Sequence, residues 1–179
     1  MSVWTHINGN IRIDCPLIVG LSDSSPKDKE CKFLILAEEI KKMLGPQSYD
    51  NRNLADEQKN AHKYKVPKGS EGTIHYRVVP FIHWSDPSEY EPNGDCECLH
   101  INITFGGDLR DFEAHDIRLA EKWFENLVAE LNEKYWIRQA FCDIDCQDEE
   151  CRHILSRGMD DDKVYKMILP VKRWWSEKE

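Results

Sequence analysis

The sequence predicts an α+β protein with a ferredoxin-like sandwich, in which two main helices cover one face of an antiparallel sheet of four to five strands. Apolar and polar residues alternate along residues 3–13, 72–84 and 96–105, as is typical of half-buried strands. Apolar residues instead follow helical spacing along residues 30–44 and 111–134. The resulting order of strand, helix, hairpin, helix and strand is that of the ferredoxin-like fold.

Length and charge narrow the class of protein. The chain has 179 residues, of which 40% are hydrophobic, so we expect a single α+β domain over residues 1–179. Its 33 acidic residues against 24 Lys and Arg give a net charge of −9, which argues against generic binding to duplex DNA. The same charge leaves open an acidic protein that occupies a nucleic-acid site by imitating phosphates.

The beginning of the chain and its cysteines indicate the compartment. The first ten residues, MSVWTHINGN, lack the basic segment and apolar run of a secretion signal, and no stretch of about 18 apolar residues would span a bilayer. We therefore expect a cytoplasmic protein without membrane contact. The seven cysteines are then expected to be free thiols and not a disulfide framework.

A strand and a helix are expected in the N-terminal part. One side of the strand at residues 3–13 is formed by Val3, Thr5, Ile7, Ile11 and Ile13. The other side is formed by Trp4, His6, Asn8, Asn10 and Arg12. The helix at residues 30–44 ends at Gly45-Pro46.

The middle of the chain is expected to form a long loop and then a hairpin. Residues 46–68 are polar with little periodicity, which predicts a long loop of functional importance or high mobility. The strands of the hairpin, at residues 72–84 and 96–105, are joined by a tip rich in Pro, Asn and Gly at residues 85–95.

The C-terminal part begins with the strongest helical pattern, at residues 111–134, whose start Asp111 would cap. A strand is expected at residues 135–144 and a last one at residues 163–171. Between them, residues 145–162 read as an acidic connection. The extra terminal strand would bring the sheet to five.

The side of the sheet that faces away from the helices is the candidate binding face, because polar side chains gather on it. His6 and Asn8, like His100 and Asn102, belong to a His-Ile-Asn tripeptide, and this fold makes the two strands that carry it neighbours. Imidazole, guanidinium and amide groups suit phosphate or carboxylate ligands, although strand alternation alone would give the same pattern. The predicted binding residues are His6, Asn8, Arg12, His75, Arg77, His100, Asn102, Asp108 and Arg110.

Two glycine-containing segments frame the hairpin, GSEG at residues 69–72 and GGDLRD at residues 106–111. Neither matches a P-loop or a dinucleotide-binding fingerprint. We expect turns and a helix cap there, with Asp108 and Arg110 exposed for contact with a partner.

Cys142, Cys146, Cys151 and His153 lie close together in the sequence and raise the question of a metal site. Structural zinc sites usually combine two cysteine or histidine pairs across a longer span, and only Cys142 and Cys146 approach the spacing within a pair. Cysteine is also an ordinary buried residue. We therefore expect no metal and no other cofactor.

The segments WTHINGNIRID, KGSEGTIHY and FGGDLRDF resemble uncharacterised small proteins encoded by phages and prophages of Gram-positive bacteria. The resemblance implies no activity. It suggests a small, acidic, cofactor-free accessory protein that binds a host or defence component.

These patterns favour a non-enzymatic binding protein that engages a protein partner or a small anionic, nucleotide-like ligand. One alternative is a phosphoesterase that uses His6 and His100 as base and acid, since two-histidine phosphoesterases carry paired His-x-Thr or His-x-Ser motifs on central strands. Here Asn8 and Asn102 replace the hydroxyl residue of those motifs. A second alternative is the acidic mimic of nucleic acid.

Overall fold

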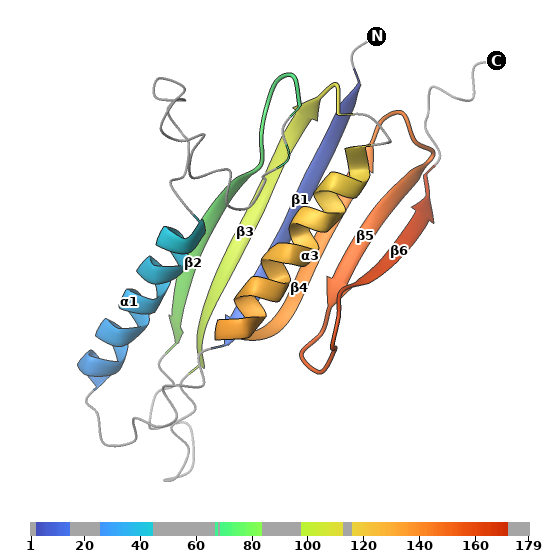
Figure 1. The fold of residues 1–179 in the computed structure, drawn as a ribbon. Coiled ribbons are helices and arrows are strands. Elements are labelled where there is room, and N and C mark those ends of the chain that lie inside the picture. Colours follow the sequence, from blue (N-terminus) through green and yellow to red (C-terminus); the bar gives the residue numbers. More distant parts are fainter. Residues whose placement is uncertain are drawn as a thin grey trace, which may run out of the picture.

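The protein has a mixed α+β architecture in which two helices accompany a six-stranded antiparallel sheet (Figure 1). The computed structural model describes residues 3–14, 26–44, 67, 69–83, 98–112 and 116–171. Its elements are β1 (Trp4–Asp14), α1 (Pro26–Leu44), β2 (His75–His83), β3 (Cys98–Arg110), α3 (Ile117–Lys134), β4 (Trp136–Cys146), β5 (Cys151–Arg157) and β6 (Tyr165–Pro170).

The strands lie in the order β2-β3-β1-β4-β5-β6, and every neighbouring pair is antiparallel. The first and third strands are therefore central neighbours, as expected. The expected number of four to five strands was too low, because β5 forms within the segment predicted as an acidic connection. Polar His153 and Arg157 occupy inward positions of β5, so the strand lacks a clear alternation of apolar and polar residues.

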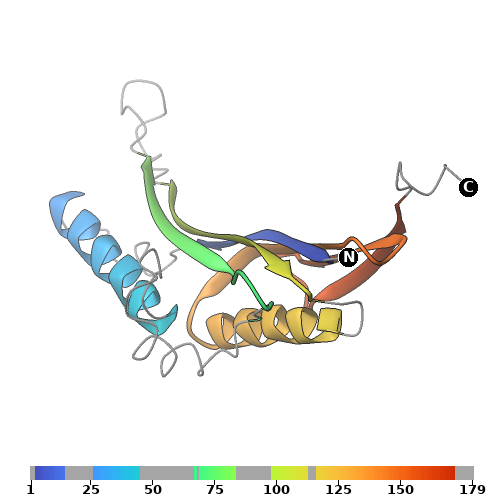
Figure 2. The same ribbon diagram turned by 90° about the horizontal axis from the view of Figure 1, so that it is seen from above.

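Both helices lie on the same side of the curved sheet (Figure 2). Helix α1 packs against β2, and α3 packs against β4. The ring of Phe105 on β3 lies 5.2 Å from that of Trp123 on α3, edge to face, which ties the helix to the centre of the sheet. Fully buried members of this core are Phe112, Phe124, Ile7, Ile11, Ile13, Ile40, Ile101, Ile103, Leu109, Ile117 and Leu131.

The alternation predicted for β1 is confirmed, since Thr5, Ile7, Ile11 and Ile13 are buried against the helices. The predicted start of the second helix was wrong. Helix α3 begins at Ile117 after Asp116, and Asp111 lies in a turn with a φ of 54° instead of capping the helix. Its carboxylate accepts a hydrogen bond from the Ser70 hydroxyl at 2.6 Å.

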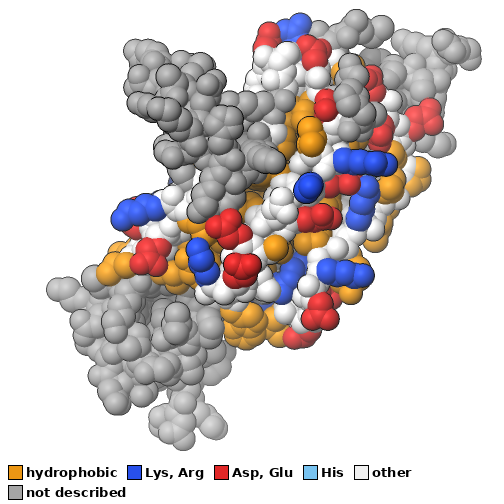
Figure 3. Space-filling view, in the orientation of Figure 1, with side chains coloured by type: hydrophobic (Ala, Val, Ile, Leu, Met, Phe, Trp, Pro, Cys, Tyr) orange, Lys and Arg blue, Asp and Glu red, His pale blue; other side chains and the backbone are white. Residues whose placement is uncertain are grey.

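Most of the predicted loop at residues 46–68, all but Pro67, and the hairpin tip at residues 85–95 lie outside the described residues. On the helix side of the molecule, acidic and basic side chains are interspersed (Figure 3). Among the helices that the structure describes, none combines the length and the apolar character needed to cross a membrane.

Candidate functional site

The strand register places all the predicted binding residues on the side of the sheet opposite the helices. We call this side the open face. It carries the even-numbered residues of β1 and β3 and the odd-numbered residues of β2, which pair directly across the ladders. The pairs His6–Asp108, Asn8–Gly106 and Arg12–Asn102 each form a row across this face, and β2 adds His75 and Arg77.

One end of the open face holds a polar cluster made by β1, β3 and the segment before β2. The His6 Nδ1 lies 2.6 Å from the Asp108 carboxylate. Arg110 donates to the Glu71 carboxylate at 2.6 Å, and backbone hydrogen bonds join Ser70 and Glu71 to Arg110. Exposed Asp108 and half-buried Arg110 therefore lie in a corner that backbone hydrogen bonds hold in place.

Glycine makes this corner possible. Gly72 has a φ of 82°, and a Cβ at this position would lie 2.0 Å from the backbone oxygen of Asp108. At Gly107 a Cβ would lie 2.2 Å from the oxygen of Thr73. The two glycine-containing segments thus pack backbone against backbone, a contact that side chains would prevent.

The two His-Ile-Asn tripeptides do not bring their histidines together, and the expected neighbourhood of His6 and His100 was wrong. His6 pairs with Asp108, whereas His100 pairs with Asp14, eight positions further along β1. At about 3.3 Å per residue the two histidines lie roughly 26 Å apart. The tripeptides run antiparallel and lie at opposite ends of the β1–β3 ladder without overlapping, so the acid and base pair required for the phosphoesterase hypothesis is not formed.

The opposite end of the open face surrounds His100. Its ring stacks on Phe81 with centroids 4.9 Å apart, and burial together with the charge of Arg12 lowers the pKa of His100. Asp14 accepts hydrogen bonds from Arg12 at 3.0 Å and from Arg138 at 2.6 Å. The Nδ1 of His100 and the Oδ1 of Asn102 are buried and have no hydrogen-bond partner among the described residues.

The β4–β6 half of the open face carries exposed apolar side chains on β4 and β6, with the polar Ser156 and Arg152 of β5 in the rows between them. Phe141 on β4 lies in one row with Tyr165 on β6, and Met167 and Leu169 follow on the same side of β6. All four side chains are exposed, as is Trp136 at the start of β4. We call Phe141, Tyr165, Met167 and Leu169 the apolar patch. An ion pair between Arg152 and Asp143 lies beside it.

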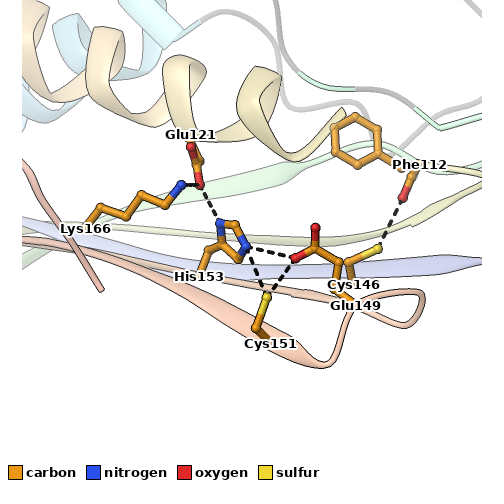
Figure 4. A network of polar contacts seen from close by, with 7 residues as sticks. All are labelled: Phe112, Glu121, Cys146, Glu149, Cys151, His153 and Lys166. Carbon is orange, nitrogen blue, oxygen red and sulfur yellow. Dashed lines mark hydrogen bonds and ion pairs between the residues drawn. The ribbon is translucent and has the colours of Figure 1, made fainter. Parts of the chain in front are cut away.

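A second polar group lies on the helix side of the sheet, where α3 crosses the outer strands (Figure 4). His153 on β5 is only 8% exposed, and its Nδ1 lies 2.6 Å from the carboxylate of Glu121 on α3, which is 9% exposed. Lys166 on β6 reaches the same Glu121 oxygen at 2.5 Å. The other ring nitrogen, Nε2, points to Glu149 at 3.0 Å and to the Cys151 sulfur at 3.6 Å.

The thiol of Cys151 donates a hydrogen bond to the Glu149 carboxylate at 2.9 Å. This hydrogen bond raises the pKa of Cys151 to about 11 and lowers the pKa of Glu149. The thiol by itself is therefore a weak nucleophile at neutral pH.

Sequence reasoning singled out Cys151 and His153 but missed Glu121, Glu149 and Lys166. A detectable signal was Glu121 itself, a carboxylate within the apolar stripe of α3 between Ala120 and Phe124. Cys142 lies in the core, where burial raises its pKa. Cys146 is buried next to this group, and its thiol donates to the Phe112 carbonyl at 3.8 Å (Figure 4).

No known family model matches the chain, and no curated protein or solved structure matches it.

Proposed function

We propose that this protein is a non-enzymatic binding protein whose open face engages a protein partner. The observation that carries the proposal is the apolar patch, four large side chains that share one side of β4 and β6 and remain exposed. Contiguous exposed apolar side chains bordered by charged ones mark protein interaction sites more often than scattered ones do. Aromatic residues and arginine, both present here, are enriched at such interfaces.

The dimensions of the open face support a macromolecular partner. Six strands spaced about 4.8 Å apart and about ten residues long, at about 3.3 Å per residue, span roughly 800 Å² in projection. A standard protein complex buries about 800 Å² on each partner. The apolar patch would form the dry part of this interface, and the polar cluster around His6 and Arg110 would form its rim.

We also propose that the architecture is an extended form of the ferredoxin-like sandwich. The antiparallel order β4-β1-β3-β2 with two helices on one side supports this assignment, with β5 and β6 added beyond β4. A cytoplasmic accessory protein of phage type, binding a host or defence component, is the biological role that we propose for it. The resemblance of the three N-terminal and central segments supports that role.

The test compares two residues of equal exposure on different surfaces. Met167 in the apolar patch and Leu119 on α3 are each 58% exposed. A partner captured from the native cell type would be purified and titrated against wild type, Met167→Glu and Leu119→Glu by calorimetry. We expect Met167→Glu to weaken binding at least tenfold, because a buried unpaired charge is costly, and Leu119→Glu to leave it within about twofold.

Two outcomes would contradict the proposal. One is a purified partner that binds Met167→Glu as tightly as wild type. The other is self-association of the pure protein that Met167→Glu abolishes, because the patch would then be the interface between two copies of this chain. Light scattering of each variant distinguishes this second case.

A second candidate function rests on the unpaired atoms of His100 and Asn102. A small planar anionic ligand of nucleotide type would satisfy both atoms with base-edge hydrogen bonds and place its phosphate near Arg12. Titration with mononucleotides would test it, with Asn102→Leu as the variant and exposed Gln139→Leu, in the same row on the far side of Arg12, as its control. Equal affinity of both variants and wild type would exclude this site.

A further inference from the structure

The group of Glu149, Cys151 and His153 presents three different ligand atoms to one point. The carboxylate oxygen, the sulfur and the imidazole Nε2 all lie within 4.8 Å of one another. Their separations are 2.9 Å between sulfur and oxygen, 3.0 Å between nitrogen and oxygen, and 3.6 Å between sulfur and nitrogen.

These separations are close to the triangle of donors around a tetrahedral metal ion. Zinc binds sulfur at about 2.3 Å, histidine nitrogen at about 2.0 Å and carboxylate oxygen at about 2.0 Å. At tetrahedral angles these bonds place sulfur about 3.5 Å from the nitrogen and from the oxygen, and the nitrogen about 3.3 Å from the oxygen. The observed sulfur–nitrogen distance agrees with this triangle, whereas the nitrogen–oxygen distance would lengthen by about 0.3 Å and the sulfur–oxygen distance by about 0.6 Å on binding.

Glu121 and Lys166 hold the His153 ring in the way that metal-binding histidines are commonly held. Glu121 holds Nδ1, and because its carboxylate only accepts hydrogen bonds, Nδ1 carries a proton. Nε2 faces Glu149 and Cys151, so this nitrogen would bind the metal ion in place of its hydrogen bond to Glu149. A carboxylate behind a ligating histidine fixes its tautomer and ring orientation in many zinc sites. Lys166 holds this carboxylate in turn (Figure 4).

Charge also favours a divalent cation. With Cys151 as a thiolate, Glu149 and Cys151 would each place a negative charge at the donor atoms, and Lys166 contacts Glu121 on the other side of His153. A doubly charged ion at the donor atoms would offset these two charges. Nitrogen, sulfur and oxygen donors together suit zinc and the neighbouring transition metals better than magnesium or calcium, which prefer oxygen alone.

We infer that Glu149, Cys151 and His153 bind one divalent transition-metal ion of the zinc type, with Glu121 and Lys166 as positioning residues. Three protein ligands leave the fourth coordination position to water. The site lies on the helix side of the sheet, so it is independent of the binding function proposed for the open face. The inferred metal site replaces the metal-free protein that the sequence led us to expect. Of the four residues that the sequence brought into question, the site uses Cys151 and His153 and leaves out Cys142 and Cys146.

The test uses the full-length protein stripped with a chelator and titrated with Co²⁺ and Zn²⁺. Wild type is expected to bind one equivalent of Co²⁺ and to develop the near-ultraviolet charge-transfer band of a cobalt thiolate. Cys151→Ser should lose this band. Glu149→Gln should weaken binding at least tenfold, whereas its exposed neighbour Glu150→Gln should bind like wild type.

The positioning residue has its own readout. Glu121→Gln should keep the charge-transfer band but weaken binding about ten- to hundredfold, the usual effect of removing a carboxylate behind a ligating histidine. Circular dichroism of each stripped variant checks that it is folded. Saturating Zn²⁺ should also protect Cys151 from alkylation, as followed by peptide mass spectrometry.

Three results would overturn the inference. The first is wild type that binds no stoichiometric Co²⁺ or Zn²⁺. The second is a Cys151→Ser variant that retains the charge-transfer band, because other cysteines would then provide the thiolate. The third is alkylation of Cys151 at the same rate with and without saturating Zn²⁺.

Discussion

At the scale of single residues, the polar corner of the open face depends on backbone conformations that only glycine adopts without strain. Gly72 has a positive φ, and its α-carbon faces the oxygen of Asp108. The letters GSEG predict a turn, whereas the segment bends at Ser70 and forms an antiparallel bridge from Glu71 to Arg110. They do not predict that the segment packs against the other glycine-containing segment. That contact joins residues about 40 positions apart, as in the bond from Ser70 to Arg110.

Replacing Gly72 with Ala is therefore expected to destabilise the protein by about 2 kcal/mol, since Ala is disfavoured at positive φ and the clashing atom belongs to the backbone. Chemical denaturation monitored by circular dichroism measures this change. Gly158→Ala is the matched control, because its nearest atom is the movable Asp161 carboxylate, at 3.0 Å. Equal stability of the two variants would show that the segment before β2 can move to accommodate the added methyl group without loss of folding free energy.

At the scale of elements, the periodicity of the sequence predicts β1, β3, β4 and α3. It does not predict β5 or the hydrogen bonds between β5 and α3. Strand β5 carries His153 and Arg157 inward, where the sequence pattern calls for apolar side chains. Each of these polar side chains can be buried because it forms hydrogen bonds with α3 or with the backbone. His153 bonds to Glu121, and Arg157 bonds to Asn132 and to the backbone oxygen of Ile137. Such partners are known only once the tertiary fold is known.

Arg157 ties β5 to the end of α3 and to β4, with hydrogen bonds of 2.9 Å to Asn132 and 3.2 Å to the backbone of Ile137. We expect Arg157→Ala to lower the free energy of unfolding by about 2 to 3 kcal/mol, because it leaves a buried carbonyl unpaired and a void. Denaturant titration gives the value. Arg138→Ala, which removes an exposed arginine from the open face, should cost less than about 1 kcal/mol.

Should the two substitutions prove equally mild, β5 would be held by its strand pairing alone. The metal-site residues of the same strand would then need a support other than this anchoring.

At the scale of the whole molecule, the sequence was sufficient to predict that polar residues of three strands share one face. It was not sufficient to predict which of these residues lie next to one another on that face. Alternation determines the side of the sheet to which a residue points, whereas the register between β1 and β3 determines its neighbour on the next strand. This register separates His6 from His100. The apolar patch was missed for a related reason, since it combines β4 with β6 across the unpredicted strand β5.

The net charge of −9 and the apolar patch lead to different expectations for the salt dependence of partner binding. An acidic mimic of nucleic acid holds its partner by many exposed charges, and raising salt from about 0.1 M to 1 M shortens the screening length from about 10 Å to about 3 Å. Its affinity would fall by more than tenfold over this range.

Binding through the apolar patch relies on burial of apolar surface, which salt does not weaken. We therefore expect the affinity of the purified partner, measured by calorimetry at both salt concentrations, to change by less than about threefold. A steep loss of affinity, together with displacement of the partner by DNA or RNA, would instead assign the function to the acidic surface and leave the apolar patch without a role in binding.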